Sequence, residues 1–308
     1  MIVIHDTDQL QHTSLAATIG FFDGVHLGHR FLIRELEEIA RARNLPSAVI
    51  TFAEHPRTVL HADYQPKLLN SFDEKIAQLA TTGVDYCIVL HFTEALSKLS
   101  AEAFITGVLK EQLHVDTLLI GYDHRFGHNR SDGFEQYAAY GRNAGMEVIE
   151  ASAFDEGQTA VSSSEIRRLI QDGEMETVRH LLTYPYRIKG TIVSGHKVGR
   201  TIGFPTANIR VDEPFKIVPG PGIYAVRVLI GEISYDGMLY IGNRPTLDNG
   251  PQESVEVNIF DFDEDLYNRE IEVSFEHYLR GDIKFDSLDA LKKQLSKDRE
   301  DALHLLRK

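Results

Sequence analysis

Two histidines, His26 and His29, stand three residues apart where an apolar run ends and a helical pattern begins. That spacing places both imidazoles on one face of the first helical turn. Asp23 and Gly24 allow a tight turn before them, and Gly28 lets a ligand approach the backbone. Because a helix N-terminus favours anions, the two imidazoles can donate hydrogen bonds to a triphosphate and stabilise departing pyrophosphate. In isolation, the same residues could form a solvated turn with a helix-capping Asp.

A second glycine-rich stretch, Gly190–Asn208, carries basic residues and ends in Pro-Thr-Ala-Asn. It is not a Walker loop, because Gly-Lys-Ser/Thr is absent at the required spacing. Its glycines can still expose backbone amides to phosphates. Thr206 and Asn208 offer neutral oxygens, which suit Mg²⁺ because that ion prefers oxygen ligands and usually keeps nucleotide phosphates in its shell. An ordinary glycine-rich hairpin is the alternative.

The elements that must position the histidines alternate between short apolar runs and longer helical patterns, from residue 1 to about 180. This alternation predicts parallel strands joined by crossover helices, with ligands at the carboxyl end of the sheet. One helix is predicted from about Leu27 to Arg43, and the capping-box pattern of Ser71 and Glu74 opens another. The predicted strands are Ala17–Phe22, Ala48–Phe52, Tyr86–Leu90, Thr117–Gly121 and Met146–Ile149.

After residue 183 the pattern changes to short alternating runs broken by Gly, Pro, Asn and Asp, which predicts a small antiparallel β-barrel or sandwich. From Ser287 to Leu306 an apolar stripe at helical spacing predicts a closing helix that packs on the barrel. The predicted domains are therefore residues 1–183 and 184–308. The predicted strands are Gly222–Leu229, Ile233–Ile241, Ser254–Phe260 and Ile271–Tyr278, and the stripe consists of Leu288, Leu291, Leu295, Ala302 and Leu305.

The bulk composition fits an ordinary globular protein of two domains. Its 308 residues exceed one usual core, and its 43% hydrophobic and 25% charged residues match neither a disordered nor a membrane chain. The net charge of −14 repels a phosphate backbone, so we expect no nucleic-acid partner. The single cysteine, Cys87, excludes an intrachain disulfide and is predicted to be a buried core residue. Without a leader-like N-terminus or a bilayer-length apolar run, the sequence predicts a cytoplasmic protein with no membrane partner.

The wider segment Gly20–His29, Gly-Phe-Phe-Asp-Gly-Val-His-Leu-Gly-His, resembles a known signature. It is similar to the FMN adenylyltransferase half of bacterial bifunctional riboflavin kinase/FAD synthetases, within the His-x-Gly-His nucleotidylyltransferase superfamily. Ser164 stands where this family usually has Thr, and His124 stands where Phe is common. Three further segments match the same half in order: Thr51–Arg57, the flavin-side loop Gly121–Gly127, and Val161–Arg167.

This resemblance implies an adenylyltransferase site assembled from all four segments. The guanidinium fork of Arg167 suits a triphosphate, which gives it a catalytic role beside His26 and His29. The implied ligand-binding residues are Gly20, Phe22, Asp23, Gly24, Gly28, Arg57, Asp123, Ser163 and Ser164.

The stretch Gly190–Asn208 resembles the riboflavin kinase signature, in which the corresponding Thr and Asn hold the metal and the nucleotide. By position in that family, Glu256 accepts the proton of the riboflavin 5′-hydroxyl, with Glu253 as a neighbouring rival. Asn258 stands where His is frequent. Further matching segments are Pro219–Val226, Ile241–Thr246, Val255–Phe262 and Leu279–Phe285. The implied ligand-binding residues are Gly195, Lys197, Gly203, Pro205, Thr206, Asn208 and Arg280, with Thr206 and Asn208 as metal ligands.

The resemblance covers nearly the whole chain and implies an N-terminal Rossmann-like domain joined to a C-terminal six-stranded antiparallel β-barrel. In the barrel, Mg·ATP would phosphorylate riboflavin to FMN; in the first domain, a second ATP would convert FMN to FAD and pyrophosphate. The expected partners are riboflavin, FMN, FAD, ATP, ADP and pyrophosphate, with Mg²⁺ as cofactor. The alternatives are a monofunctional adenylyltransferase with a flavin-binding regulatory barrel, and a non-enzymatic flavin sensor. A class I aminoacyl-tRNA synthetase is disfavoured, because no Lys-Met-Ser-Lys-Ser segment is present.

Overall fold

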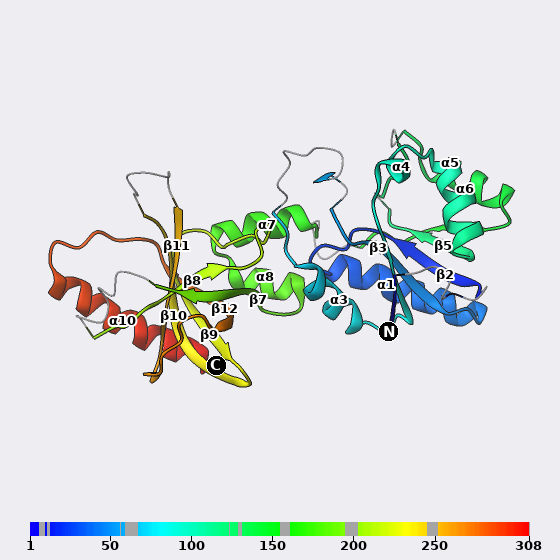
Figure 1. Ribbon diagram of the computed structural model, residues 1–308. Helices are drawn as coiled ribbons and strands as arrows, with labels where there is room; N and C mark the ends of the chain where they lie inside the picture. Colours follow the sequence, from blue (N-terminus) through cyan, green and yellow to red (C-terminus); the bar gives the residue numbers. More distant parts are fainter. Residues whose placement is uncertain are drawn as a thin grey trace. The chain divides into compact units, whose positions relative to one another are not determined.

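In the computed structural model the chain forms two compact units, Met1–Ser162 and Ser163–Lys308 (Figure 1). Helices α7 (Ser163–Asp172) and α8 (Met175–Leu182) fall in the second unit. The sequence predicts that the two enzymatic domains meet at residue 183, and this boundary remains a prediction. The structure describes residues 1–5, 10, 13–55, 57–58, 67–122, 124–128, 131–154, 161–194, 203–244 and 252–307.

The first unit contains a parallel sheet of six strands within the described residues, in the order β1-β4-β3-β2-β5-β6. All residues of β2 and β3 are buried, as expected for parallel strands covered on both faces. The predicted parallel sheet is therefore confirmed, although the prediction missed β1, an edge strand of three residues. The strands are β1 (Ile2–Ile4), β2 (Leu15–Ile19), β3 (Ser47–Phe52), β4 (Tyr86–Leu90), β5 (Val115–Ile120) and β6 (Glu147–Glu150).

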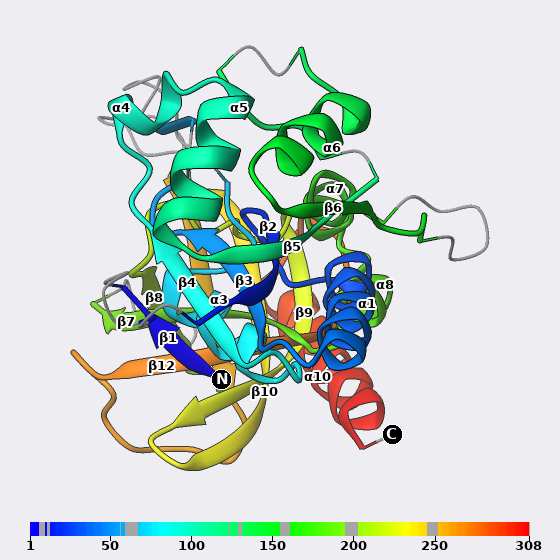
Figure 2. The ribbon, with the colours of Figure 1, turned by 90° about the vertical axis from the view of Figure 1, so that its right-hand side faces the viewer.

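Helices cover both faces of this sheet, with α1 on one side and α5 and α6 on the other (Figure 2). Neighbouring residues of one strand therefore enter different cores. Val49 packs in a cluster with Ile33 of α1, whereas Ile50 packs in a cluster with Ile105. The helices are α1 (Leu27–Arg43), α3 (Phe72–Ala80), α4 (Glu94–Ser97), α5 (Ala101–Ala103), the π-helix η2 (Phe104–Gln112) and α6 (Phe134–Asn143).

Cys87 lies on β4 and is fully buried, so its predicted place in the core is confirmed. Burial raises the pKa of its thiol to about 11, because the low-dielectric surroundings disfavour the thiolate. The side chain therefore acts as a small apolar residue.

The second unit contains a closed antiparallel barrel in the order β10-β11-β8-β7-β12-β9. Along β7 inward and outward residues alternate, with Tyr186 and Ile188 buried between exposed neighbours. The barrel prediction is confirmed, although β7 and β8 were not among the predicted strands. The strands are β7 (Tyr186–Val193), β8 (Ala207–Val211), β9 (Gly222–Ile230), β10 (Ile233–Arg244), β11 (Gln252–Ile259) and β12 (Glu270–Arg280).

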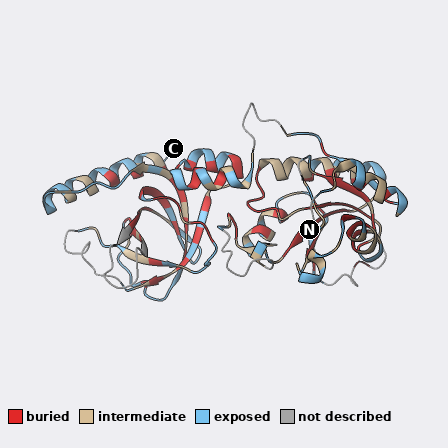
Figure 3. Ribbon diagram, turned by 90° about the horizontal axis from the view of Figure 1, so that it is seen from above, coloured by how far each residue is buried: buried red, intermediate tan, exposed pale blue. Residues whose placement is uncertain are grey.

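The C-terminal helix α10 (Leu288–Leu306) packs on the barrel, as predicted. Its Ala302 and Leu306 join a buried cluster with Met238 of β10, whereas its outer face is exposed (Figure 3). The predicted stripe is wrong at Leu288, whose side chain is 63% exposed, because the first turn of the helix does not reach the barrel. None of the described helices combines the length and the apolar content needed to cross a bilayer.

The capping box of α3 is present as predicted. Ser71 Oγ accepts a hydrogen bond from the Glu74 amide at 3.2 Å, and the Glu74 carboxylate accepts one from the Ser71 amide at 2.9 Å. Together they satisfy two amides that the helix start leaves without helical partners.

Replacing Ser71 by Ala removes one of these acceptors, so we expect α3 to lose about 1 kcal/mol of local stability. Hydrogen exchange of the amides at residues 72–80 would measure this loss directly. Ser131→Ala serves as a control, because Ser131 lies exposed outside helices and strands. Equal exchange rates in wild type and Ser71→Ala would contradict the prediction.

Candidate active sites

The turn between β2 and α1 has an unusual backbone. Phe22, Gly24 and Val25 have φ angles of 56°, 83° and 40°, so the chain enters the left-handed region three times within four residues. Such a conformation is rare for a β-branched residue like Val25 and persists only where surrounding contacts fix it. The predicted tight turn at Asp23 and Gly24 is therefore confirmed, and β2 ends before Phe22 because the turn has already begun.

Asp23 supplies contacts that hold this turn. Its carboxylate is buried and accepts hydrogen bonds from the Leu69 amide at 3.0 Å and the Asn70 amide at 3.2 Å. The alternative of a solvated turn capped by Asp is wrong, because the N-cap of α1 is His26. Asp23 thus joins the first loop of the sheet to the segment before α3.

His26 and His29 lie together at the N-terminus of α1, as their spacing predicts. Their rings stack with centroids 3.7 Å apart and an interplanar angle of 18°. Phe22 packs edge-on against His29, with centroids 5.1 Å apart. No acidic residue occupies the first turn of α1. The amides and the dipole of this helix therefore remain suited to an anion.

The pKa of His29 is lowered well below its usual value of 6.5. Burial is the largest cause, followed by electrostatic repulsion from His26, His124 and Lys75. His29 is therefore neutral at pH 7. Its Nδ1 is buried and has no hydrogen-bond partner among the described residues.

An aromatic cavity of about 200 Å³ opens at the carboxyl end of the same sheet. Phe52 meets Phe92 edge-on at 5.4 Å, and Phe104 meets Phe126 at 5.7 Å, so the walls suit a flat ring system. Three of the four segments matched in the sequence contribute to its lining. The residues that line it are Ile19, Phe21, Phe52, Arg57, Phe92, Leu96, Ser97, Leu99, Phe104, His124, Arg125, Phe126, Gly127 and His128.

The other residues predicted for the first site lie in different parts of the structure. Gly20 is needed for space, because a Cβ there would meet the Phe22 ring at 3.0 Å. Ser163, Ser164 and Arg167 lie in the first turns of α7, which belongs to the second unit. Asp123 lies outside the described residues.

In the barrel, Thr206 and Asn208 meet Glu256. Asn208 on β8 pairs directly with Glu256 on β11, and Thr206 Oγ1 donates to Glu256 Oε2 at 3.1 Å. Ser254 Oγ donates to Glu256 Oε1 at 2.9 Å, so both carboxylate oxygens are oriented by hydroxyls. The structure thus brings Thr206 and Asn208 together with Glu256, which lies about fifty positions further along the chain. Asn258, in the position where a His is frequent, donates to the Pro205 carbonyl at 2.6 Å and so braces the start of β8.

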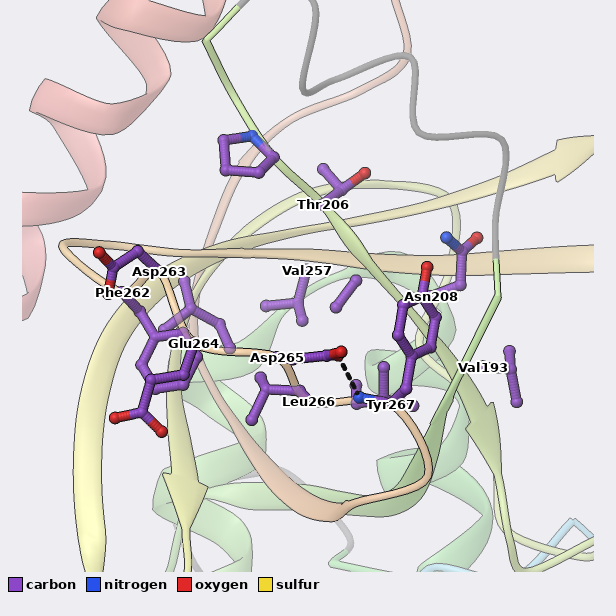
Figure 4. Close-up of a pocket in the computed structure, with 14 residues that line it drawn as sticks. Val193, Thr206, Asn208, Val257, Phe262, Asp263, Glu264, Asp265, Leu266 and Tyr267 are labelled. Carbon is purple, nitrogen blue, oxygen red and sulfur yellow. Dashed lines mark hydrogen bonds between the residues drawn. The ribbon is translucent and has the colours of Figure 1, made fainter.

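A pocket of about 280 Å³ lies beside these residues (Figure 4). Val193, Val257 and Leu266 give it apolar walls, and Thr206 and Asn208 line it as well. The segment Asp263–Tyr267 also lines the pocket and was not predicted, because the matched block ended at Phe262. Within that segment the Tyr267 amide donates to the Asp265 carboxylate at 3.0 Å, which fixes the loop. A short acidic run directly after a predicted strand was the available signal.

The remaining predicted residues of the barrel are only partly described. Gly203 has a φ of 85° and is exposed just before β8. Gly195, Lys197 and the side chain of the rival base Glu253 lie outside the described residues.

Arg280 at the end of β12 forms an ion pair with a buried carboxylate. Its Nη2 donates to Asp298 Oδ2 at 2.7 Å and its Nε donates to Asp298 Oδ1 at 3.0 Å, while Asp298 on α10 is only 2% exposed. Gln294 also donates to Asp298 at 2.8 Å. The guanidinium therefore fastens α10 to the barrel, and its predicted substrate contact stays a prediction.

Comparison with known proteins defines the class of the chain first. Residues 8–165 match the family model of FAD synthetase, and residues 182–306 match that of riboflavin kinase. The chain therefore combines two flavin-nucleotide enzyme domains in the order that the sequence predicts.

Full-length relatives then specify the family. A bifunctional riboflavin kinase/FMN adenylyltransferase of Listeria monocytogenes is 38% identical over 96% of this chain and 93% of the relative. The protein of the same description from Haemophilus influenzae is 40% identical over 93% and 92%. The chain belongs to the bifunctional riboflavin kinase/FMN adenylyltransferase family. A single-activity protein and a flavin sensor are accordingly not favoured.

A solved structure shares the fold over both units. A crystal structure from Streptococcus pneumoniae, described as a macrolide-efflux protein, has a TM-score of 0.84 and 32% identity, with 97% of each chain covered.

The contacts of Arg280 predict that Arg280→Lys loosens α10. Lysine keeps the charge but loses the planar fork that contacts both oxygens of Asp298, so we expect α10 to lose about 2 kcal/mol of protection in hydrogen exchange. Arg299→Lys is the matched control, because Arg299 lies on the same helix and pairs with the exposed Asp261. A raised KM for riboflavin with unchanged α10 protection would instead assign Arg280 to the substrate.

Proposed function

We propose that the two activities of this family, phosphorylation of riboflavin and adenylylation of FMN, take place at the two separate sites described above. The proposal rests on one observation: within each unit, residues from separate matched segments lie together. In the first unit the aromatic cavity receives residues from three matched segments, and in the second Thr206, Asn208 and Glu256 meet across two strands.

In the first unit, we assign the aromatic cavity to the flavin ring and the start of α1 to the ATP phosphates. His26 and His29 lie at the helix start, where they can donate hydrogen bonds to the triphosphate. The FMN phosphate attacks the α-phosphorus of ATP, and the bond to pyrophosphate breaks. The neutral state of His29 suits this role, because it supplies an N–H donor without acting as a permanent cation.

Residues outside this cavity complete the assignment on the resemblance alone. Arg167, Ser163 and Ser164 would bind the ATP phosphates, and Asp123 would contact the flavin nucleotide. Arg57 lines the cavity, where its guanidinium suits the FMN phosphate.

In the barrel, we assign Glu256 as the base that aligns the riboflavin 5′-hydroxyl and accepts its proton. The hydroxyls of Thr206 and Ser254 orient its two carboxylate oxygens. Phosphoryl transfer depends mainly on positioning and charge neutralisation, so a single oriented carboxylate is sufficient. The apolar walls of the neighbouring pocket suit the nucleotide base, with Gly195 and Lys197 assigned to the phosphates by resemblance.

The donor set beside this pocket fits Mg²⁺. Thr206 and Asn208 supply hard neutral oxygens next to the Glu256 carboxylate. Among the described residues, no three His, Cys, Asp or Glu side chains are arranged so that they could hold a metal ion by themselves. A polyphosphate beside Glu256 and the acidic run Asp263–Asp265 needs a counter-ion. When bound, Mg²⁺ would neutralise phosphate charge.

A cytoplasmic location remains a prediction from the sequence.

The two assignments predict reciprocal losses of activity. Glu256→Gln keeps the size of the side chain but removes the base, so we expect FMN formation from riboflavin to fall by about 10²-fold or more. FAD synthesis from supplied FMN should stay within about twofold of wild type. His29→Ala should give the opposite result, because it removes a triphosphate donor from the other unit. Chromatographic separation of riboflavin, FMN and FAD measures both reactions.

Glu272→Gln is the matched control, because Glu272 is a strand carboxylate of the same barrel that pairs with Arg187. It should leave both reactions unchanged. Loss of both activities in folded Glu256→Gln, or retention of FMN formation, would exclude the assignment of independent sites with Glu256 as base.

The metal assignment predicts a specific defect in Thr206→Val. Valine preserves the side-chain shape but removes the hydroxyl oxygen, so the Mg²⁺ concentration for half-maximal FMN formation should rise by about tenfold. Thr191→Val is the control, since Thr191 Oγ1 donates to Asp212 elsewhere on the barrel. An unchanged Mg²⁺ requirement in Thr206→Val would remove Thr206 from the metal site.

A further inference from the structure

Lys75 on α3 is a buried lysine to which neither the sequence motifs nor the proposed reaction assigns a role. Its side chain is 3% exposed, and its ammonium donates to the Phe21 carbonyl at 3.2 Å, Thr51 Oγ1 at 3.2 Å and the Phe52 carbonyl at 2.8 Å. Three acceptors match the three N–H donors of an ammonium. The side chain therefore crosses from α3 to the carboxyl ends of β2 and β3.

The residues that Lys75 contacts line the aromatic cavity. Phe21 and Phe52 both belong to its walls. The Lys75 ammonium also lies 4.1 Å from the centroid of the Phe21 ring, which adds a cation–π contact to the hydrogen bond with the same residue. Thr51 Oγ1 donates in turn to the Phe21 carbonyl at 3.1 Å, so the three groups form one network. One buried cation thus fixes two adjacent walls of the cavity.

Burying a lysine is costly unless its charge is compensated, and an apolar residue would fill this space at lower cost. Lys75 nevertheless contacts Phe21, which lies in the turn just before His26 and the start of α1. We propose that Lys75 is a positioning residue for adenylyl transfer, which fixes Phe21 and Phe52 at the flavin cavity and places a positive charge near His29. This inference rests on the proposed assignment of the first site.

The charges around Lys75 are consistent with this role. Burial lowers its pKa to about 8, opposed by the nearby Asp23, Cys87 and Glu54, so the side chain is largely protonated at pH 7. Its charge is one of the causes that lower the pKa of His29. Since a nearby cation disfavours the protonated imidazole, loss of the Lys75 charge must raise the pKa of His29.

Two further groups, His26 and His124, complete the electrostatic surroundings that any pH dependence must include. Both lower the pKa of His29 in the same direction as Lys75. As the pH rises through about 8, Lys75 loses its proton, and its hold on the Phe21 and Phe52 carbonyls weakens. FAD synthesis in the wild type should therefore fall on the alkaline side of pH 8.

The test is Lys75→Met in the full chain, with both reactions measured on the same preparation. Methionine fills the space without the ammonium, so we expect kcat/KM for FMN in FAD synthesis to fall by about 10²-fold, the loss that a misplaced substrate produces. FMN formation from riboflavin should stay within about twofold, because its assigned site lies in the other unit. The alkaline decline of FAD synthesis near pH 8 should disappear.

An NMR titration of the imidazole signals gives a readout that does not depend on activity. The pKa of His29, assigned with His29→Asn, should shift upward in Lys75→Met. Lys110→Met is the matched control: Lys110 is hydrogen-bonded to Asp116 and the Gly145 carbonyl, at the amino end of the sheet. It should change neither the His29 titration nor FAD synthesis.

Comparing Lys75→Met with His29→Ala separates the role of Lys75 from the site assignment on which that role rests. If His29→Ala abolishes FAD synthesis while Lys75→Met resembles wild type in rate and in the His29 titration, the role of Lys75 is wrong. If His29→Ala retains FAD synthesis, the site assignment itself is wrong.

A second variant keeps the inference testable if Lys75→Met does not fold. Thr51→Val removes one acceptor of Lys75 and one donor to Phe21 while preserving shape. We expect a three- to tenfold lower kcat/KM for FMN, about 1 kcal/mol at the transition state. Wild-type kinetics in Thr51→Val would contradict the proposed network.

Discussion

The first site depends on a turn that the chain can adopt only under constraint. Between β2 and α1, Val25 takes a backbone conformation that β-branched residues avoid, and Phe22 also has a positive φ. The cost of such a conformation must be offset by the surroundings. Asp23 provides part of this compensation by accepting two amide hydrogen bonds from the segment before α3. The geometry of this turn allows α1 to begin with two stacked imidazoles.

A comparable constraint acts in the barrel through strand pairing. Thr206, Asn208 and Glu256 meet because β8 lies beside β11 in a register that sets Asn208 opposite Glu256. A shift of one residue would turn Glu256 to the other face of the sheet. Asn258 limits such a shift by donating to the Pro205 carbonyl at the start of β8. The residues that surround the assigned base thus have a structural function as well.

Periodicity and capping chemistry predicted much of the fold from the sequence. The bounds Leu27–Arg43 of α1 and the capping box at Ser71 follow from local interactions, so the sequence contains them directly. The edge strand β1 was missed because three residues carry too little periodicity. Leu288 was misplaced because a helical stripe predicts a face but does not predict how far the partner surface extends.

The residues of the candidate sites also differ in whether the sequence could predict them. Motifs identified His26, His29, Thr206 and Asn208, because their spacing is local. Lys75 could not be found in this way, since its significance lies in contacts with Phe21 and Phe52 that are more than twenty positions away. The role of Arg280 was also not predictable, because its partner Asp298 belongs to a helix whose docking depends on the tertiary fold.

The burial of Cys87 also affects how this protein can be studied in solution. Its thiol is inaccessible and protonated at ordinary pH, so it reacts poorly with maleimide or iodoacetamide reagents. The chain has no other cysteine and no tryptophan. A single cysteine introduced on the surface could therefore carry a fluorophore or spin label in the natural sequence background, and a single introduced tryptophan would report its own surroundings without interference.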